Sequence, residues 1–76
     1  MTKNNNSPYK LSKNVLKDKT ILITGAGDGI GRSAAITYAS QGATVILLGK
    51  TKAKLERVYD EIEKHGYPTP SISLMD

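Results

Sequence analysis

One short stretch of the chain, residues 24–31, contains four glycines between an apolar run and a helix-like segment. Glycine at Gly25, Gly29 and Gly31 permits a positive φ and lets the backbone approach a ligand without an intervening Cβ. The following helix would point unpaired backbone N–H groups at that ligand, an arrangement that binds phosphate. The alternative is an ordinary glycine-rich turn without a ligand, but the position of the loop between a strand and a helix disfavours this alternative. We therefore predict a phosphate-binding loop for a nucleotide.

The composition limits what else the protein can be. A chain of 76 residues makes one domain at most and cannot hold a large two-site enzyme. It has no cysteine, which excludes disulfides, Cys-based zinc sites and thiol catalysis, and its single histidine cannot build a metal site alone. The apolar runs are too short to span a membrane, and the polar N-terminus lacks a secretory apolar region. We expect a cytoplasmic protein with no metal and no membrane partner.

The net charge of +4 lies in residues 1–19, which carry five lysines against one aspartate. Residues 20–76 carry six basic and six acidic side chains, so the folded part should be neutral. Nucleic acid is an unfavoured partner, because the interleaved aromatic residues and arginines typical of such sites are lacking. Residues 1–13 are polar and rich in asparagine, which predicts a disordered basic tail before a domain in residues 14–76.

Strand and helix signals alternate after the tail. Residues 19–24 predict a short buried strand that ends in the glycine loop, and residues 30–41 predict a helix of small residues closed by Gly42. Residues 44–48 are apolar on both faces, which is typical of a central strand covered by helices on both sides. Residues 71–75 alternate weakly and predict a third strand.

A second helix is expected between the last two strands, with Thr51 as its N-cap and Gly66 near its C-terminus. Four residues with helical spacing form its apolar stripe: Leu55, Val58, Tyr59 and Ile62. Three pairs of opposite charge stand four residues apart on its other face: Lys52/Glu56, Arg57/Glu61 and Asp60/Lys64. The complete order is β-α-β-α-β.

This order predicts an α/β fold, the N-terminal half of a Rossmann-type doubly wound parallel sheet with three strands. Ligands of such folds lie beyond the carboxyl ends of the strands. Residues 25–31, residues 49–51 and Asp76 should therefore meet at one edge of the sheet.

The usual dinucleotide fingerprint, G-x-G-x-x-G, does not fit the loop, because Ile30 stands where the third glycine belongs. Read as T-G-x-x-x-G-I-G, residues 24–31 match completely, and this is the motif of the short-chain dehydrogenase/reductase family. Residues 16–76 resemble the N-terminal, cofactor-binding half of that family. The resemblance is strongest to bacterial members with a TGASDGIG loop and an LLGR strand end, the YciK-type oxidoreductases.

The end of the second strand indicates which cofactor is preferred. NAD binders place an Asp or Glu there, about 20 residues past the loop, but none occurs between Arg32 and Lys54. The strand ends instead in Gly49, Lys50 and Thr51. A lysine attracts the 2′-phosphate of NADP, the glycine leaves space for it, and the threonine adds a hydroxyl. NADP is therefore preferred over NAD, and the alternative is that Lys50 is only an exposed surface lysine.

The resemblance assigns further roles. Asp28 stands where many NADP-dependent relatives have a basic residue, which weighs slightly against NADP. Asp76 falls where the family holds the adenine amino group with a carboxylate, although as the last residue it could instead be frayed. The expected cofactor-binding residues are Thr24, Gly25, Gly27, Asp28, Gly29, Ile30, Gly31, Gly49, Lys50, Thr51 and Asp76.

Catalysis in the family is carried by Ser, Tyr and Lys in a Tyr-x-x-x-Lys arrangement after the third strand. That arrangement is missing here. The sequence from Tyr9 to Lys13 does match Tyr-x-x-x-Lys, but it precedes the first strand, and we interpret the match as coincidence. We expect a truncated chain or fragment without the catalytic half, which binds the cofactor of a hydride transfer between NADP(H) and a carbonyl or alcohol but does not turn over alone.

The alternative function is a non-catalytic nucleotide-binding or interaction module. Its first strand would lie at an open edge of the sheet, which a partner chain could complete. Self-association through this edge would follow.

Overall fold

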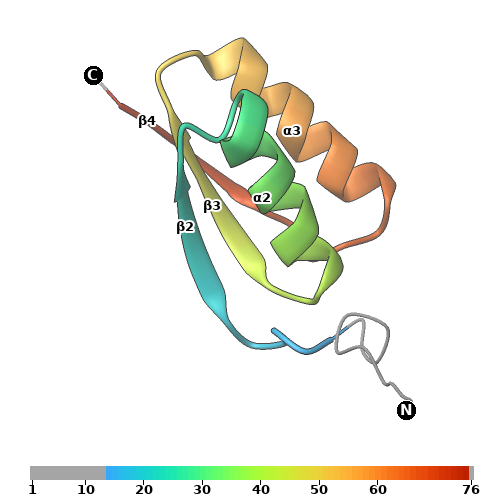
Figure 1. Cartoon of the computed structure of the whole chain (residues 1–76). Helices are drawn as coiled ribbons and strands as arrows, with labels where there is room; N and C mark the ends of the chain where they lie inside the picture. The colour runs from blue at the N-terminus through green and yellow to red at the C-terminus, as the bar shows by residue number, and fades with distance from the viewer. Residues whose placement is uncertain (1–13, 76) are drawn as a thin grey trace.

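Three strands and two helices alternate along the chain in a computed structural model that describes residues 14–75. The elements are β2 (Thr20–Thr24), α2 (Gly29–Ser40), β3 (Thr44–Gly49), α3 (Lys52–Lys64) and β4 (Ser71–Leu74) (Figure 1). The predicted order is confirmed, and the observed bounds differ from the expected ones by a single residue at most. The predicted basic tail, residues 1–13, and Asp76 lie outside the described residues.

The strands form one parallel sheet in the order β2-β3-β4, so β3 is central as predicted. Ile23 pairs with Leu47, which pairs with Ile72 on its other side. The backbone N–H of Ala26 donates to the carbonyl of Leu48 at 3.2 Å, which ties the glycine loop to the end of β3. The carboxyl ends of the strands therefore meet at one edge, with the loop directly beside β3.

Both helices lie on the same face of the sheet (Figure 1), so the expectation of helices on both sides of β3 is wrong for the described residues. Two right-handed crossovers that advance in the same direction place their helices on one face. Val45 and Leu47 of β3 are fully buried on that face, while Ile46 and Leu48 on the opposite face are only partly buried. Leu22, on this second face, is 55% exposed.

The core between the sheet and the helices combines small and large side chains. Ala35 and Ala39 of α2 are buried, and their size lets that helix lie close to the sheet. The predicted apolar stripe of α3 is confirmed, because its aliphatic members are fully buried and its tyrosine partly so: Leu55, Val58, Ile62 and Tyr59. Burial of the aliphatic side chains is the main force that holds α3 to the sheet.

The charged residues of α3 make contacts that differ from the expected set. Lys52 and Glu56 pair at 3.9 Å as predicted. Glu61 pairs instead with Arg32 of α2, so an ion pair joins the two helices where one within α3 was expected. A partner 29 positions away cannot be read from spacing along one helix.

Within residues 14–75, no helix is long and apolar enough to cross a membrane. The same residues contain no cluster of three or more His, Cys, Asp or Glu side chains arranged to hold a metal ion. The cytoplasmic location stays a prediction.

Candidate functional site

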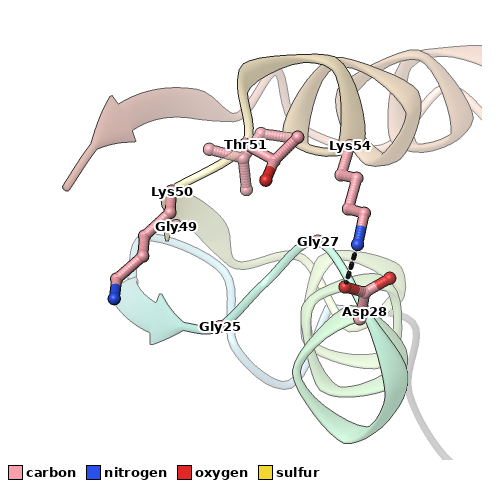
Figure 2. A pocket seen from close by; sticks show the side chains of 8 residues that line it. Gly25, Gly27, Asp28, Gly49, Lys50, Thr51 and Lys54 are labelled. Carbon is pink, nitrogen blue, oxygen red and sulfur yellow. Dashed lines mark hydrogen bonds and ion pairs between the residues drawn. The ribbon is translucent and has the colours of Figure 1, made fainter. Parts of the chain in front are cut away.

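A pocket of about 150 Å³ lies at the carboxyl edge of the sheet, between the glycine loop, the end of β3 and the first turn of α3 (Figure 2). Eight residues line it: Gly25, Gly27, Asp28, Gly49, Lys50, Thr51, Lys54 and Leu55. The first six are among the residues expected from the sequence. The loop and the end of β3, which are 24 positions apart in the chain from Gly25 to Gly49, thus form one site.

The glycines of the loop serve two different structural needs. Gly25 and Gly29 have φ values of 62° and 53°, in the left-handed region that L side chains rarely adopt. Gly31 does not need a positive φ. A Cβ at this position would lie 2.1 Å from the carbonyl oxygen of Gly25, so its side-chain hydrogen lets the first turn of α2 pack against the loop.

The helices begin beside the pocket without side-chain caps. Asp28 is the N-cap of α2 and Thr51 is the N-cap of α3, and both have extended backbones, but neither side chain makes a capping hydrogen bond. The first N–H groups of a helix have no partner within it, and the helix dipole adds partial positive charge there. The start of α2, beside the pocket, therefore offers backbone donors suited to an anion.

Two lysines that border the pocket differ in their ion pairing (Figure 2). Lys54 reaches from α3 to the glycine loop, where its Nζ lies 2.8 Å from Oδ2 of Asp28. Lys50 follows β3 and extends away from Lys54, and it makes no ion pair within residues 14–75. One end of the pocket thus carries an ion pair, and the other carries a lysine that has no ion-pair partner among residues 14–75.

Four expected residues do not line this pocket. Thr24, Ile30 and Gly31 line a wider hollow along β2 and α2, and Ile30 there is 90% exposed. Gly29 borders a neighbouring depression on α2. Gly25 lines both the pocket and the wider hollow, so the loop is the wall between them.

Lys54 and Leu55 are pocket residues that sequence reasoning missed. Leu55 is a member of the predicted apolar stripe, and a Cβ on Gly49 would lie 3.0 Å from its Cδ2, so the small residue at the end of β3 lets this leucine pack. Lys54 looks like any charged residue of an exposed helix face. Its contact with Asp28, 26 positions away, depends on the fold.

A parallel β-α-β-α-β sheet with a glycine loop and an uncapped helix N-terminus at its carboxyl edge defines a Rossmann-type nucleotide-binding half domain. The family model described as short chain dehydrogenase matches residues 19–74, and the chain belongs to that family.

Named relatives agree with this assignment. The uncharacterized oxidoreductase YciK of Escherichia coli K12 is 47% identical over 68 residues, which are 90% of this chain and 27% of YciK. A short chain dehydrogenase from Shigella flexneri, solved in complex with NADP, is 48% identical and superimposes with a TM-score of 0.82 over 86% of this chain and 27% of its own.

A third relative, a short chain dehydrogenase from Escherichia coli CFT073 solved in complex with NADPH, is 48% identical with a TM-score of 0.81, over 86% of this chain and 27% of its own. The predicted resemblance to YciK is confirmed. The chain spans about a quarter of the length of these relatives, 27% in each case.

Proposed function

We propose that this chain binds NADP(H) at the carboxyl-edge pocket, as the cofactor-binding part of an NADP-dependent oxidoreductase. The observation that carries the proposal is Lys50, a lysine without an ion-pair partner among the described residues, at the strand end where NAD binders carry an acid. A phosphate group there gains a charge-assisted hydrogen bond, while a ribose 2′-hydroxyl gains little.

The pocket fits one part of the cofactor. Its volume of about 150 Å³ is smaller than sites that enclose a drug-sized ligand, which measure about 300–1,000 Å³. We place the 2′-phosphate at Lys50 and Thr51 and the adenine at Asp76. The backbone N–H groups at the start of α2 would hold the pyrophosphate, and the hollow beside Ile30 would leave room for the rest of the dinucleotide. Two relatives solved with NADP or NADPH support this choice of cofactor.

The proposed role of the chain's own residues is to bind and orient. Bound NADPH supplies the hydride, which in the family passes to a carbonyl or returns from an alcohol. The loop amides and Lys50 hold the phosphates, which fixes the adenosine end of the dinucleotide. A Tyr-x-x-x-Lys arrangement after β4 does not occur in the printed sequence, so we propose that the 76-residue chain binds cofactor without turning over substrate.

The test is a fluorescence titration of the 76-residue chain with NADPH and with NADH. Charged hydrogen bonds contribute about 1.5–3 kcal/mol, so Lys50→Ala should weaken NADPH binding about tenfold or more and leave NADH unchanged. Lys52→Ala is the matched control, since this lysine is 69% exposed on α3 and does not line the pocket. Equal affinity of all the variants for both dinucleotides would contradict the assignment of Lys50.

We also propose that the chain self-associates through β2. This strand lies at the edge of the three-stranded sheet, and an unpaired edge is a template for pairing with another chain. Leu22 of β2 is 55% exposed and adds apolar surface to that edge. Sedimentation velocity over a wide concentration range tests this, and a monomer at every concentration would contradict it.

A further inference from the structure

We propose that Lys54 is a positioning residue that holds the Asp28 carboxylate away from the N-terminus of α2 and so keeps this helix end open to the phosphates of the cofactor. The inference rests on the proposed function. It assigns a role to Lys54, which lies outside the glycine motif. It also explains how the negatively charged Asp28 is tolerated in a loop that binds phosphate.

Asp28 is placed to block the very donors that a phosphate needs. An N-cap aspartate normally accepts a hydrogen bond from the second or third N–H of its helix, which here belong to Ile30 and Gly31. The backbone of Asp28, with φ −142° and ψ 157°, has the extended conformation of an N-cap, yet its side chain makes no capping bond. A carboxylate turned back onto these groups would occupy the donors and repel an anion.

Lys54 accounts for the observed direction of the carboxylate. Its Nζ lies 2.8 Å from Oδ2 of Asp28, and the pair bridges α3 and the loop at the pocket (Figure 2). The stem of Lys54 passes over Gly27, because a Cβ added there would lie 2.8 Å from the Cβ of Lys54. The first carbons of the Lys54 side chain therefore lie against the loop, which brings its ammonium group to the Asp28 carboxylate.

The pair is too exposed to act mainly by stabilising the fold. The Lys54 and Asp28 side chains are 46% and 71% exposed, and surface ion pairs of this kind add little to folding stability. The charge of Lys54 is matched by Asp28, while Lys50 has no acidic partner among residues 14–75. We therefore assign recognition of the 2′-phosphate to Lys50 and control of Asp28 to Lys54.

A double-mutant cycle on the 76-residue chain separates this role from direct phosphate binding. Lys54→Gln should raise the Kd of NADPH and of NADH alike by about fivefold, because an N-cap side chain is worth about 1 kcal/mol to its helix and a ligand must displace it. In an Asp28→Ala background the same substitution should have no effect on either Kd. Lys52→Gln, which removes a lysine of α3 outside the pocket, should leave both affinities unchanged.

A second measurement needs no cofactor. Amide hydrogen exchange followed by NMR should slow about fivefold at Ile30 and Gly31 in Lys54→Gln, since the released carboxylate now caps these groups. The double variant with Asp28→Ala should show no slowing. Glu61→Gln is the structural control, because it removes the ion pair of Glu61 with Arg32, which joins α3 to α2, and leaves the pocket untouched.

Three results would overturn the inference. One is unchanged exchange at Ile30 and Gly31 in Lys54→Gln, and another is the same slowing in Glu61→Gln. The third is a loss of affinity confined to NADPH that persists in the Asp28→Ala background, which would make Lys54 a direct ligand of the 2′-phosphate. A folded wild-type chain that binds neither dinucleotide would instead overturn the proposed function, and the exchange data would still decide whether Lys54 controls Asp28.

Discussion

The helix ends at the two edges of the sheet differ in how their backbone groups are hydrogen-bonded. At the carboxyl edge, Asp28 and Thr51 are the N-caps of α2 and α3 and make no side-chain capping bond. Both lie beside a pocket with Lys50, which makes no ion pair within residues 14–75. At the opposite edge, both helices are closed by glycines in the left-handed region, Gly42 with φ 99° and Gly66 with φ 77°. Their N–H groups donate to Ala39 and Glu63 carbonyls at 3.0 and 2.9 Å, which satisfies backbone acceptors at the helix ends.

The difference separates an edge whose backbone groups bond within the chain from an edge whose helix N-termini keep donors for a ligand. At the opposite edge, backbone hydrogen bonds from Leu16 to Gln41 and from Thr44 to Lys19, at 2.8 and 2.9 Å, connect the segment before β2 with the end of α2 and the start of β3. These backbone groups are therefore already hydrogen-bonded within the chain. At the carboxyl edge the helix N-termini keep donors for a ligand, so substitutions at the two edges should affect stability and binding differently.

The largest effect is expected for Gly31→Ala at the carboxyl edge. Its Cβ would meet the Gly25 carbonyl oxygen at 2.1 Å, and backbone cannot yield as a flexible side chain can. We expect the free energy of unfolding to fall by about 3 kcal/mol, at the upper end for overpacking, together with loss of NADPH binding by the folded fraction. Urea denaturation and NADPH titration measure the two effects, and wild-type affinity would show that the loop can move without harm.

Gly42→Ala should produce a smaller effect on stability alone. The left-handed backbone costs an L residue about 1–2 kcal/mol, and the added Cβ would lie 3.1 Å from the Lys17 backbone nitrogen. The melting temperature should fall while the Kd of NADPH for the folded chain stays at the wild-type value. A loss of affinity as large as that of Gly31→Ala would remove the contrast between the edges.

Thr51→Ala should change stability least. Removal of an N-cap side chain usually costs about 1 kcal/mol, but the Thr51 side chain makes no capping bond, so the change in unfolding free energy should stay within about 0.5 kcal/mol. NADPH affinity should fall about threefold if the hydroxyl contacts the 2′-phosphate, because a neutral hydrogen bond contributes about 0.5–1.5 kcal/mol. A stability loss above the stated range would show that the hydroxyl does cap α3 in solution.

Local patterns predicted the fold and two of the segments that form the site. The glycines of the loop, the small residues of α2 and the apolar stripe of α3 are signals that neighbouring residues carry by themselves. Parallel pairing with β3 at the centre followed from the alternation of strands and helices. The structure confirms the order of strands and helices, the central place of β3 and the burial of the apolar stripe. The role of the loop in binding stays a prediction.

The errors concern relations between distant residues. The apolar residues on both faces of β3 suggested helices on both sides, but only the handedness and direction of the crossovers decide which face α2 and α3 cover. Lys54 and Lys52 are alike in sequence, and only the fold brings one of them to Asp28. The role expected of Asp76 stays a prediction, since this residue lies outside the described part of the chain.

The central claim is that the carboxyl edge binds the phosphorylated adenosine of NADP. The most direct measurement is a titration of the ¹⁵N-labelled chain with 2′-phospho-AMP, followed by amide chemical shifts. The claim predicts that the largest shifts occur at the loop glycines, Lys50 and Thr51, with none at Gly42 or Gly66. Shifts centred on the opposite edge, or a spectrum that does not change at high nucleotide concentration, would contradict it.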